Sequence, residues 1–225
     1  MARESPPEFR ASEARLRVLI GPQCAPGHRD PMTQRTPPTI RFYTSNEGKV
    51  REVRELLEGR GYRVAWSRRE LTEPQADDLE EVARAKLAAV PRGKDLALVE
   101  DSGIFVAALG GFPGVYSAYV LRTLGLPGIL RLVDGKPRAA EFRAVVGLRD
   151  GTRTRFFHGA VKGTLAPRPR GSGGFGYDPI FIPDGKTQTT AEMTSAEKNA
   201  LSHRGKALRG LARYLAPPGR VSRSA

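Results

Sequence analysis

The chain has 225 residues, a hydrophobic content of 39% and a formal net charge of +13. Its apolar runs are far shorter than the roughly 20 residues that cross a bilayer, so we expect no membrane-spanning helix and no membrane partner. The single cysteine, Cys24, excludes an internal disulfide and a cysteine-built zinc site, which favours a cytoplasmic protein.

The positive charge is spread along the chain, and basic residues are scattered among acidic ones rather than concentrated in one basic run. Such a charge attracts a polyanionic small molecule as readily as a nucleic acid. A nucleotide- or nucleic-acid-binding module therefore stays open as a hypothesis, although we expect no stable nucleic-acid binding.

The two ends differ in composition from the middle of the chain. Residues 1–38 contain seven prolines and one apolar patch, Leu16–Ile20. We expect this extension to be mostly disordered, with Met32 as an alternative start. The prediction is one ordered domain over residues 39–216, followed by a flexible tail over 217–225.

The ordered part begins with a pattern that favours phosphate binding. Residues 40–44 alternate as a strand does, and a polar turn at 45–49 leads into a helix with Val50, Val53, Leu56 and Leu57 on one face. The helix N-terminus supplies backbone donors, Gly48 permits close approach, and Lys49 adds a cation. Ser45-Asn46 is equally typical of a simple helix cap, so both interpretations remain open here.

The central segment, residues 98–106, carries two adjacent carboxylates. We predict strands at residues 63–66 and 98–106, with a helix over residues 79–90 between them. Ser102-Gly103 would allow a bend that turns Glu100 and Asp101 toward one cleft, where Glu73 could join them around a divalent metal. The alternative is a strand that ends in a solvated turn.

The next segments give two short helices, at 116–124 and 127–133, and a hairpin formed by 139–148 and 152–160. The glycines of 171–176 formally match a dinucleotide fingerprint. We reject that match because the strand-like residues 180–182 follow instead of a helix. The loop instead offers Phe175 and Tyr177 to a flat ring and Asp178 to the ring N–H groups.

The last organised segment places Lys198, His203, Arg204 and Lys206 just before a helix whose apolar face ends at Leu215. Cations at a helix start oppose the helix dipole, which indicates an anionic or carbonyl-bearing ligand; a solvated face is the alternative. Together with the phosphate loop and the carboxylates, this pattern describes a site for a nucleoside triphosphate and Mg2+.

Five segments carry a resemblance to the inosine/xanthosine triphosphate pyrophosphatases, and they stand in that family's order between Ile40 and about Leu215. They are Thr44-Ser-Asn-Glu-Gly-Lys49, Glu100-Asp-Ser-Gly103, Gly111-Phe-Pro-Gly-Val-Tyr-Ser117, Gly174-Phe-Gly-Tyr-Asp-Pro179, and Ala191-Glu-Met with Glu197-Lys-Asn and Ser202-His-Arg204. The resemblance implies an α/β, two-lobed fold around a long mixed β-sheet with flanking helices and the cleft between the lobes, usually as a homodimer. It also implies hydrolysis of ITP, dITP and XTP to the monophosphate and pyrophosphate.

The same resemblance assigns roles to residues. Asp101 would be the general base for water attacking the α-phosphorus. Glu73 and Asp101 would hold Mg2+, and Glu100 is a further candidate ligand. The residues expected to bind the nucleotide are Thr44, Ser45, Asn46, Glu47, Gly48, Lys49, Ser102, Phe175, Gly176, Tyr177, Asp178, Lys198, His203 and Arg204. Two departures from the commoner bacterial pattern are Tyr119, where many relatives have Arg, and Glu73-Pro-Gln. A related pyrophosphatase for pyrimidine or modified nucleotides is the competing enzyme.

Overall fold

The computed structural model describes residues 37–216, which form a six-stranded sheet in the order β2-β1-β3-β4-β5-β6. β1 (Thr39–Thr44) pairs in parallel with both β2 (Arg63–Arg68) and β3 (Leu96–Val106). The remaining pairs are antiparallel, so the sheet is mixed, as predicted. The predictions for residues 1–36, Met32 and the tail lie outside the described residues.

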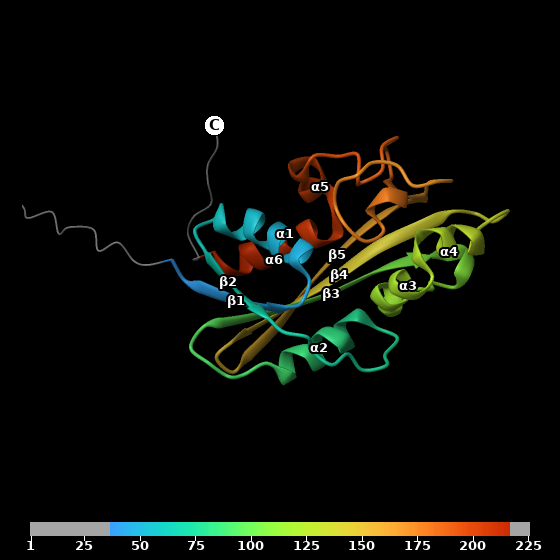
Figure 1. Ribbon diagram of the computed structural model, residues 1–225. Helices are drawn as coiled ribbons and strands as arrows, with labels where there is room; N and C mark the ends of the chain where they lie inside the picture. Colours follow the sequence, from blue (N-terminus) through green and yellow to red (C-terminus); the bar gives the residue numbers. More distant parts are fainter. Residues whose placement is uncertain (1–36, 217–225) are drawn as a thin grey trace, which may run out of the picture. The chain divides into compact units, whose positions relative to one another are not determined.

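Helices cover both faces of the parallel part of the sheet (Figure 1). α1 (Glu47–Glu58) and α6 (His203–Leu215) pack on one face, and their apolar side chains form one core cluster with Ile40, Phe42 and Leu98. α2 (Leu79–Ala89) packs on the other face, against Val99 and Val145. The two helical periodicities read from the sequence are thereby confirmed.

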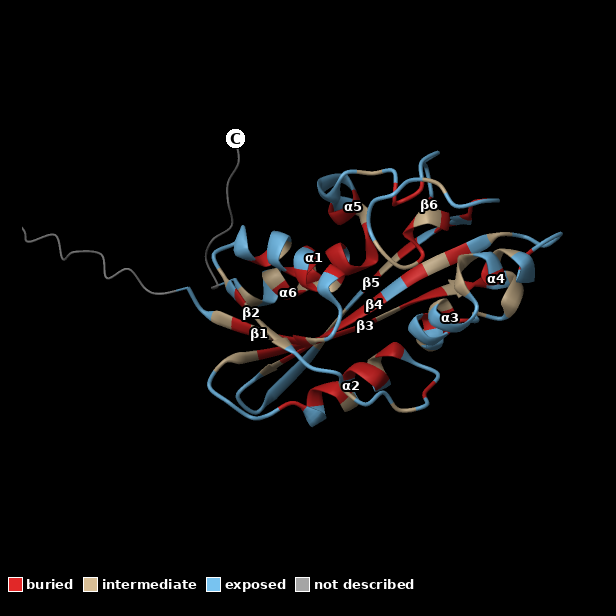
Figure 2. Cartoon of the chain, in the orientation of Figure 1, coloured by how far each residue is buried: buried red, intermediate tan, exposed pale blue. Residues whose placement is uncertain are grey.

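The antiparallel part extends the sheet beyond these helices. β4 (Ala139–Asp150) and β5 (Arg153–Leu165) form a hairpin longer than predicted, and β6 (Phe181–Pro183) pairs with the end of β5. α3 (Ser117–Thr123) and α4 (Gly125–Leu132) pack there against Ile104, Phe142 and Phe181. Figure 2 shows buried residues running along the sheet between the two groups of helices. This arrangement gives the two lobes that were predicted.

Short elements complete the fold. Three 3-10 turns span Ala107–Leu109, Gly114–Tyr116 and Asp178–Ile180, and α5 (Ser195–Leu201) precedes α6. Residues 171–176 form a loop that leads into a single 3-10 turn and then β6 instead of an α-helix, which confirms that they are not a dinucleotide fingerprint. Within residues 37–216, no helix has both the length and the apolar character needed to span a membrane.

Candidate functional site

The phosphate loop lies where β1 ends and α1 begins. Asn46 caps the helix, because its side chain accepts a hydrogen bond from the Lys49 backbone N–H at 3.1 Å. The Asn46 N–H in turn donates to Thr44 Oγ1 at 3.1 Å. Gly48 is needed for close approach, since a Cβ there would lie 2.5 Å from Cδ1 of Phe175. The loop therefore presents a helix N-terminus beside the aromatic ring of a segment more than 120 residues away.

The two central carboxylates point to opposite faces of the sheet. The register between β3 and β4 is continuous from Ala97 to Val106, so the predicted bend at Ser102-Gly103 is wrong. A regular strand alternates its side chains. Glu100 accordingly pairs with Lys49 at 2.7 Å, on the α1 face, and Asp101 contacts Lys86 on the α2 face.

Lys86 joins the carboxylates that were predicted to hold a metal. Its Nζ lies 2.5 Å from Asp101 Oδ1 and 2.6 Å from Glu73 Oε1, so Glu73 does reach the neighbourhood of Asp101. Sequence reasoning missed this lysine. The signal was its position seven residues after Leu79 and three after Ala83, on the inward stripe of α2.

The surroundings of Asp101 favour its neutral form more than water does. Burial raises the pKa of the Asp101 carboxyl above its ordinary value, although Lys86 and Lys49 act in the opposite direction. Burial alone would lower the pKa of Lys86, but Asp101 and Glu73 outweigh it and raise that pKa. Oδ2 of Asp101 is buried without a hydrogen-bond partner among the described residues. An acceptor with a raised pKa is suited to take a proton from water.

A second cluster of charges lies on the α1 face. Arg204, at the start of α6, is almost fully buried; its Nε donates to Glu100 at 3.0 Å, Nη2 donates to Ser102 Oγ at 3.1 Å, and Nη1 pairs with Glu52 of α1. Glu52 also forms an ion pair with Lys198 of α5, at 2.7 Å between Oε1 and Nζ. Glu52 is the second residue of this candidate site that sequence reasoning missed; it stands next to Val53 on the buried side of α1.

The ionisation states of this cluster follow from pairing. Burial alone would raise the pKa of the Glu52 and Glu100 carboxyls, but Arg204 with Lys198 or Lys49 holds both pKa values below their ordinary range. Burial and the neighbouring Arg204 lower the pKa of His203 well below its usual value, so its imidazole is neutral at neutral pH. That ring stacks on Phe142 at 4.6 Å between centroids.

The aromatic loop closes the other side of this cluster. The Phe175 ring centre lies 4.7 Å from Lys198 Nζ and 5.4 Å from Arg204 Cζ, within cation–π range. Asp178 accepts from the Phe175 N–H at 2.6 Å and pairs with Lys198 at 2.6 Å. Tyr177 differs from the prediction, because its buried hydroxyl donates to the Ser117 carbonyl instead of facing the aromatic ring of a ligand.

Most of the predicted residues are therefore joined by direct contacts, which run from the phosphate loop through β3 and α6 to the aromatic loop. Ser45 and Glu47 are exposed on the phosphate loop, and Gly176 contributes backbone only. The predicted residues that take part in the contacts are Thr44, Asn46, Gly48, Lys49, Glu73, Glu100, Asp101, Ser102, Phe175, Asp178, Lys198 and Arg204.

The donor set beside Lys86 fits Mg2+. No group of three metal-binding side chains occurs within residues 37–216. Mg2+ needs only one or two carboxylates when phosphate oxygens and waters complete its coordination. Glu73 Oε1 and Asp101 Oδ1 both contact the Lys86 ammonium, and Asp101 Oδ2, which has no hydrogen-bond partner among the described residues, is the oxygen that could bind such an ion. Glu100, on the other face, does not join them.

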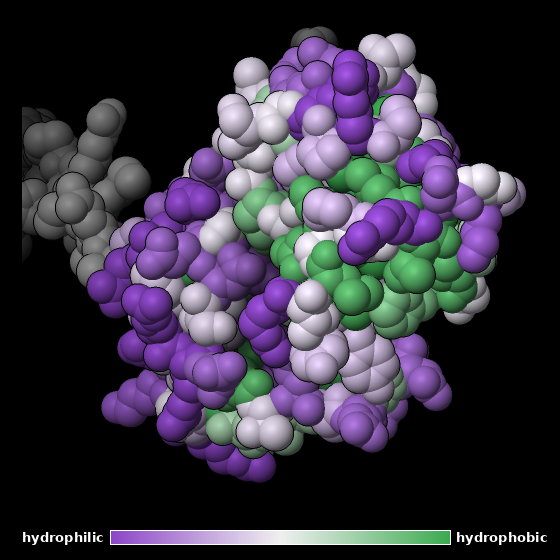
Figure 3. Space-filling model, turned by 45° about the vertical axis from the view of Figure 1, so that its right-hand side comes forward, coloured by the Kyte–Doolittle hydropathy of each residue, from purple (hydrophilic) through white to green (hydrophobic). Residues whose placement is uncertain are grey.

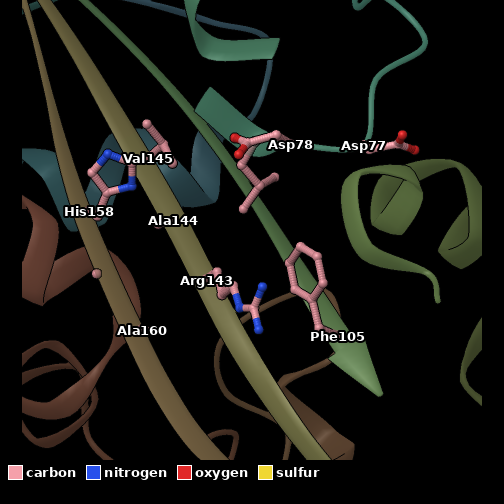
Figure 4. A pocket seen from close by; sticks show the side chains of 10 residues that line it. Asp77, Asp78, Phe105, Arg143, Ala144, Val145, His158 and Ala160 are labelled. Atoms are coloured by element: carbon pink, nitrogen blue, oxygen red, sulfur yellow. The ribbon is translucent and has the colours of Figure 1, made fainter. Parts of the chain in front are cut away.

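A groove of about 320 Å³ lies elsewhere on the α2 face, past the N-terminus of α2. Figure 4 shows Phe105 from β3, Arg143 from β4 and His158 from β5 around it, with Asp77 and Asp78 on the opposite rim. None of the predicted site residues lines this groove. It is a feature separate from the chemistry described above.

Comparison with known proteins matches the Ham1 family over residues 40–214. A dITP/XTP pyrophosphatase of Thermococcus kodakarensis is 52% identical over 179 residues, covering 78% of this chain and 96% of that protein. The enzyme of the same name from Pyrococcus horikoshii is 48% identical over 179 residues, with 78% and 96% coverage. The solved structure of a HAM1 protein from Coxiella burnetii has a TM-score of 0.67 and 31% identity, covering 79% of this chain and 98% of that one. The matched segment contains every site residue described above.

Proposed function

Since the chain belongs to the Ham1 family, we propose that it hydrolyses ITP, dITP and XTP to the nucleoside monophosphate and pyrophosphate. Relatives that match nearly their whole length are dITP/XTP pyrophosphatases. Such an activity removes these nucleotides from the nucleotide pool, and we place it in the cytoplasm.

The observation that carries this proposal is one continuous network of ion pairs between the phosphate loop and the aromatic loop. It starts at Lys49 and ends at Asp178, passing through Glu100, Arg204, Glu52 and Lys198. A ligand that contacts both loops must span this network. A purine ring joined to a triphosphate offers an aromatic ring to Phe175 and negative charge to Lys49, which suits this arrangement.

Recognition of the base would use the cationic end of the network. Phe175 offers a ring for stacking, and Lys198 and Arg204 offer N–H groups to the 6-oxo oxygen, where adenine has a donor instead. Glu52 holds both cations in place through its two oxygens. Leaving those donors without an acceptor discriminates against adenine by up to about 10⁴-fold.

The chemical step would take place beside Asp101. Asp101 accepts the proton of the attacking water, and Lys86 fixes its carboxylate through Oδ1 while Oδ2 remains available. Lys49 and the N-terminus of α1 neutralise the phosphates that leave. Mg2+, held by Glu73 and Asp101, would supply further positive charge to the phosphate oxygens.

The test is pyrophosphate release from dITP, XTP, dGTP, dATP and dUTP, each with Mg2+ and with a chelator. We expect turnover of dITP and XTP that needs Mg2+. Turnover of dUTP in their place would assign the chain to a related pyrophosphatase, and release unchanged by chelator would exclude the metal role of Glu73 and Asp101.

We also propose that the chain forms a homodimer through the face that carries α3. Phe112, Tyr116 and Tyr119 are 39%, 42% and 59% exposed, and apolar side chains gather on this side (Figure 3). The adjoining groove contains both acids and bases, which allows two copies to pair across a two-fold axis. Sedimentation should detect a dimer that Tyr119→Asp dissociates. Tyr214→Asp, at a tyrosine on α6 that is 40% exposed, is the control.

A further inference from the structure

The carboxyl end of β2 lies directly beside the phosphate loop. β1 and β2 pair in parallel with Thr44 opposite Arg68, so both residues stand at the same edge of the sheet. Val64 and Trp66 of β2 pack into the core cluster under α1. Because side chains alternate along a strand, Arg68 points to that same face, on which the N-terminus of α1 also lies.

The residues around Arg68 are tied to the loop itself. Trp66 Nε1–H donates to the Thr44 carbonyl at 2.9 Å, and the Arg69 backbone N–H donates to the same oxygen at 3.4 Å. The Arg68 guanidinium lies 5.9 Å from the centre of the Trp66 ring. The indole is thus a rigid support that carries the guanidinium beside the first residue of the loop.

Arg68 differs from the cations inside the site in having no carboxylate partner among residues 37–216. The site itself is short of positive charge. Its five carboxylates are Glu52, Glu73, Glu100, Asp101 and Asp178, and its four cations are Lys49, Lys86, Lys198 and Arg204. A triphosphate adds several negative charges, more than the two positive charges of Mg2+ would offset, so an unpaired guanidinium at the edge of the site would be strongly favoured as a phosphate ligand.

We propose that Arg68 binds the distal phosphates of the substrate, those that leave as pyrophosphate. This inference rests on the proposed function. The α-phosphorus must lie at Asp101 on β3, and Arg68 on β2 lies on the far side of β1 from that strand. Asp101 and Arg68 point to opposite faces, but β1 ends at Thr44, level with Glu100, so a phosphate chain that passes from Asp101 over the end of β1 brings its distal end to Arg68. The planar guanidinium fork suits two phosphate oxygens at once.

The experiment measures binding of inorganic pyrophosphate and of dIMP, each with Mg2+, to wild type and to Arg68→Gln by titration calorimetry. We expect Arg68→Gln to weaken pyrophosphate about tenfold, the effect of one charge-assisted contact, and to leave dIMP unchanged. Arg68→Lys keeps the charge but not the planar fork, so its affinity for pyrophosphate should lie between those of wild type and Arg68→Gln. Arg63→Gln is the matched control, because Arg63 contacts Thr39 at the opposite end of β2.

Two outcomes would overturn the proposal: unchanged pyrophosphate affinity in Arg68→Gln, or equal weakening of pyrophosphate and dIMP. Thermal unfolding of each variant separates loss of binding from loss of folding. Failure of the proposed function has a different signature, since wild type would then release no pyrophosphate from dITP or XTP.

Discussion

The contact between α6 and β5 predicts a large effect from one methyl group. Gly159 of β5 faces the first turn of α6, and a Cβ there would lie 2.0 Å from the His203 carbonyl oxygen and 2.7 Å from the Ala207 nitrogen. Ordinary contact begins near 3.4 Å, so α6 would have to retreat by about 1.4 Å in Gly159→Ala. Both opposing atoms are backbone, which cannot rotate away as a side chain can.

The retreat would disturb the site because Arg204 stands in that first turn. Overpacking of this kind costs about 1–3 kcal/mol, and the contact with backbone puts Gly159→Ala near the upper end. A displacement of about 1 Å in a positioning group can reduce activity about 100-fold. Arg204 makes its contacts with Glu52 and Glu100 over hydrogen-bond distances, so a comparable loss is expected in kcat/KM for dITP.

Gly210→Ala is the matched control on the same helix. Its Cβ would lie 3.5 Å from Phe157, which is ordinary contact, and alanine inside a helix is favoured over glycine by about 0.5–1 kcal/mol. Urea denaturation should therefore show opposite shifts for the two variants, with activity retained in Gly210→Ala. If Gly159→Ala unfolds at the wild-type urea concentration and keeps its kcat/KM, the argument for a rigid α6–β5 contact is refuted.

Three further predictions concern the buried charges. Asp101→Asn should lower kcat for dITP by about 10²–10⁴-fold while dITP binding persists, and retained turnover would remove Asp101 as the base. Lys86→Met leaves Asp101 buried without its cation and should lower the free energy of unfolding by about 3–5 kcal/mol. In a double-mutant cycle, adding Asp101→Asn should restore part of that loss, and strictly additive losses would contradict the pairing. The pKa of the Glu100 carboxyl is depressed below its ordinary 4.5, so its contribution to the free energy of unfolding is complete above that pH and is lost as pH falls toward the lower folded-state pKa. A plot of the free energy of unfolding against pH in the acid range should therefore be shallower for Glu100→Gln than for wild type. An equal slope would count against the ion pairs of Glu100.

The sequence was sufficient for those parts of the fold that depend on local pattern. Alternation predicts the strand at residues 40–44, the helical period predicts α1 and α2, and capping preference predicts the Asn46 cap. Each of these signals acts over only a few residues. The hairpin was also predicted, although β4 and β5 extend further because each lies between two other strands, which a turn signal does not reveal.

The site was predicted only where function required an unusual residue type. Lys86 and Glu52 escaped notice because a charged residue on an amphipathic helix normally faces water. The burial of Lys86 depends on Asp101, which lies 15 residues away in the sequence, and the burial of Glu52 depends on Arg204, which lies 152 residues away. The prediction for Tyr177 was wrong in the opposite sense, because an aromatic residue in a glycine-rich loop can equally well enter the core. Tyr177 does so, and its hydroxyl donates to the Ser117 carbonyl.

The absence of the predicted bend in β3 changes how the two adjacent carboxylates are understood. A regular strand sends Glu100 to a face with Arg204 and Lys49 and Asp101 to a face where burial dominates, so the pKa of Glu100 falls while that of Asp101 rises. A pair of like groups whose pKa values are driven apart can divide the work between a permanent anion and a proton acceptor. Under the proposed function, Glu100 would organise Lys49 and Arg204 for the substrate, and Asp101 would activate the water. The alternation of a single strand is sufficient to separate the two roles.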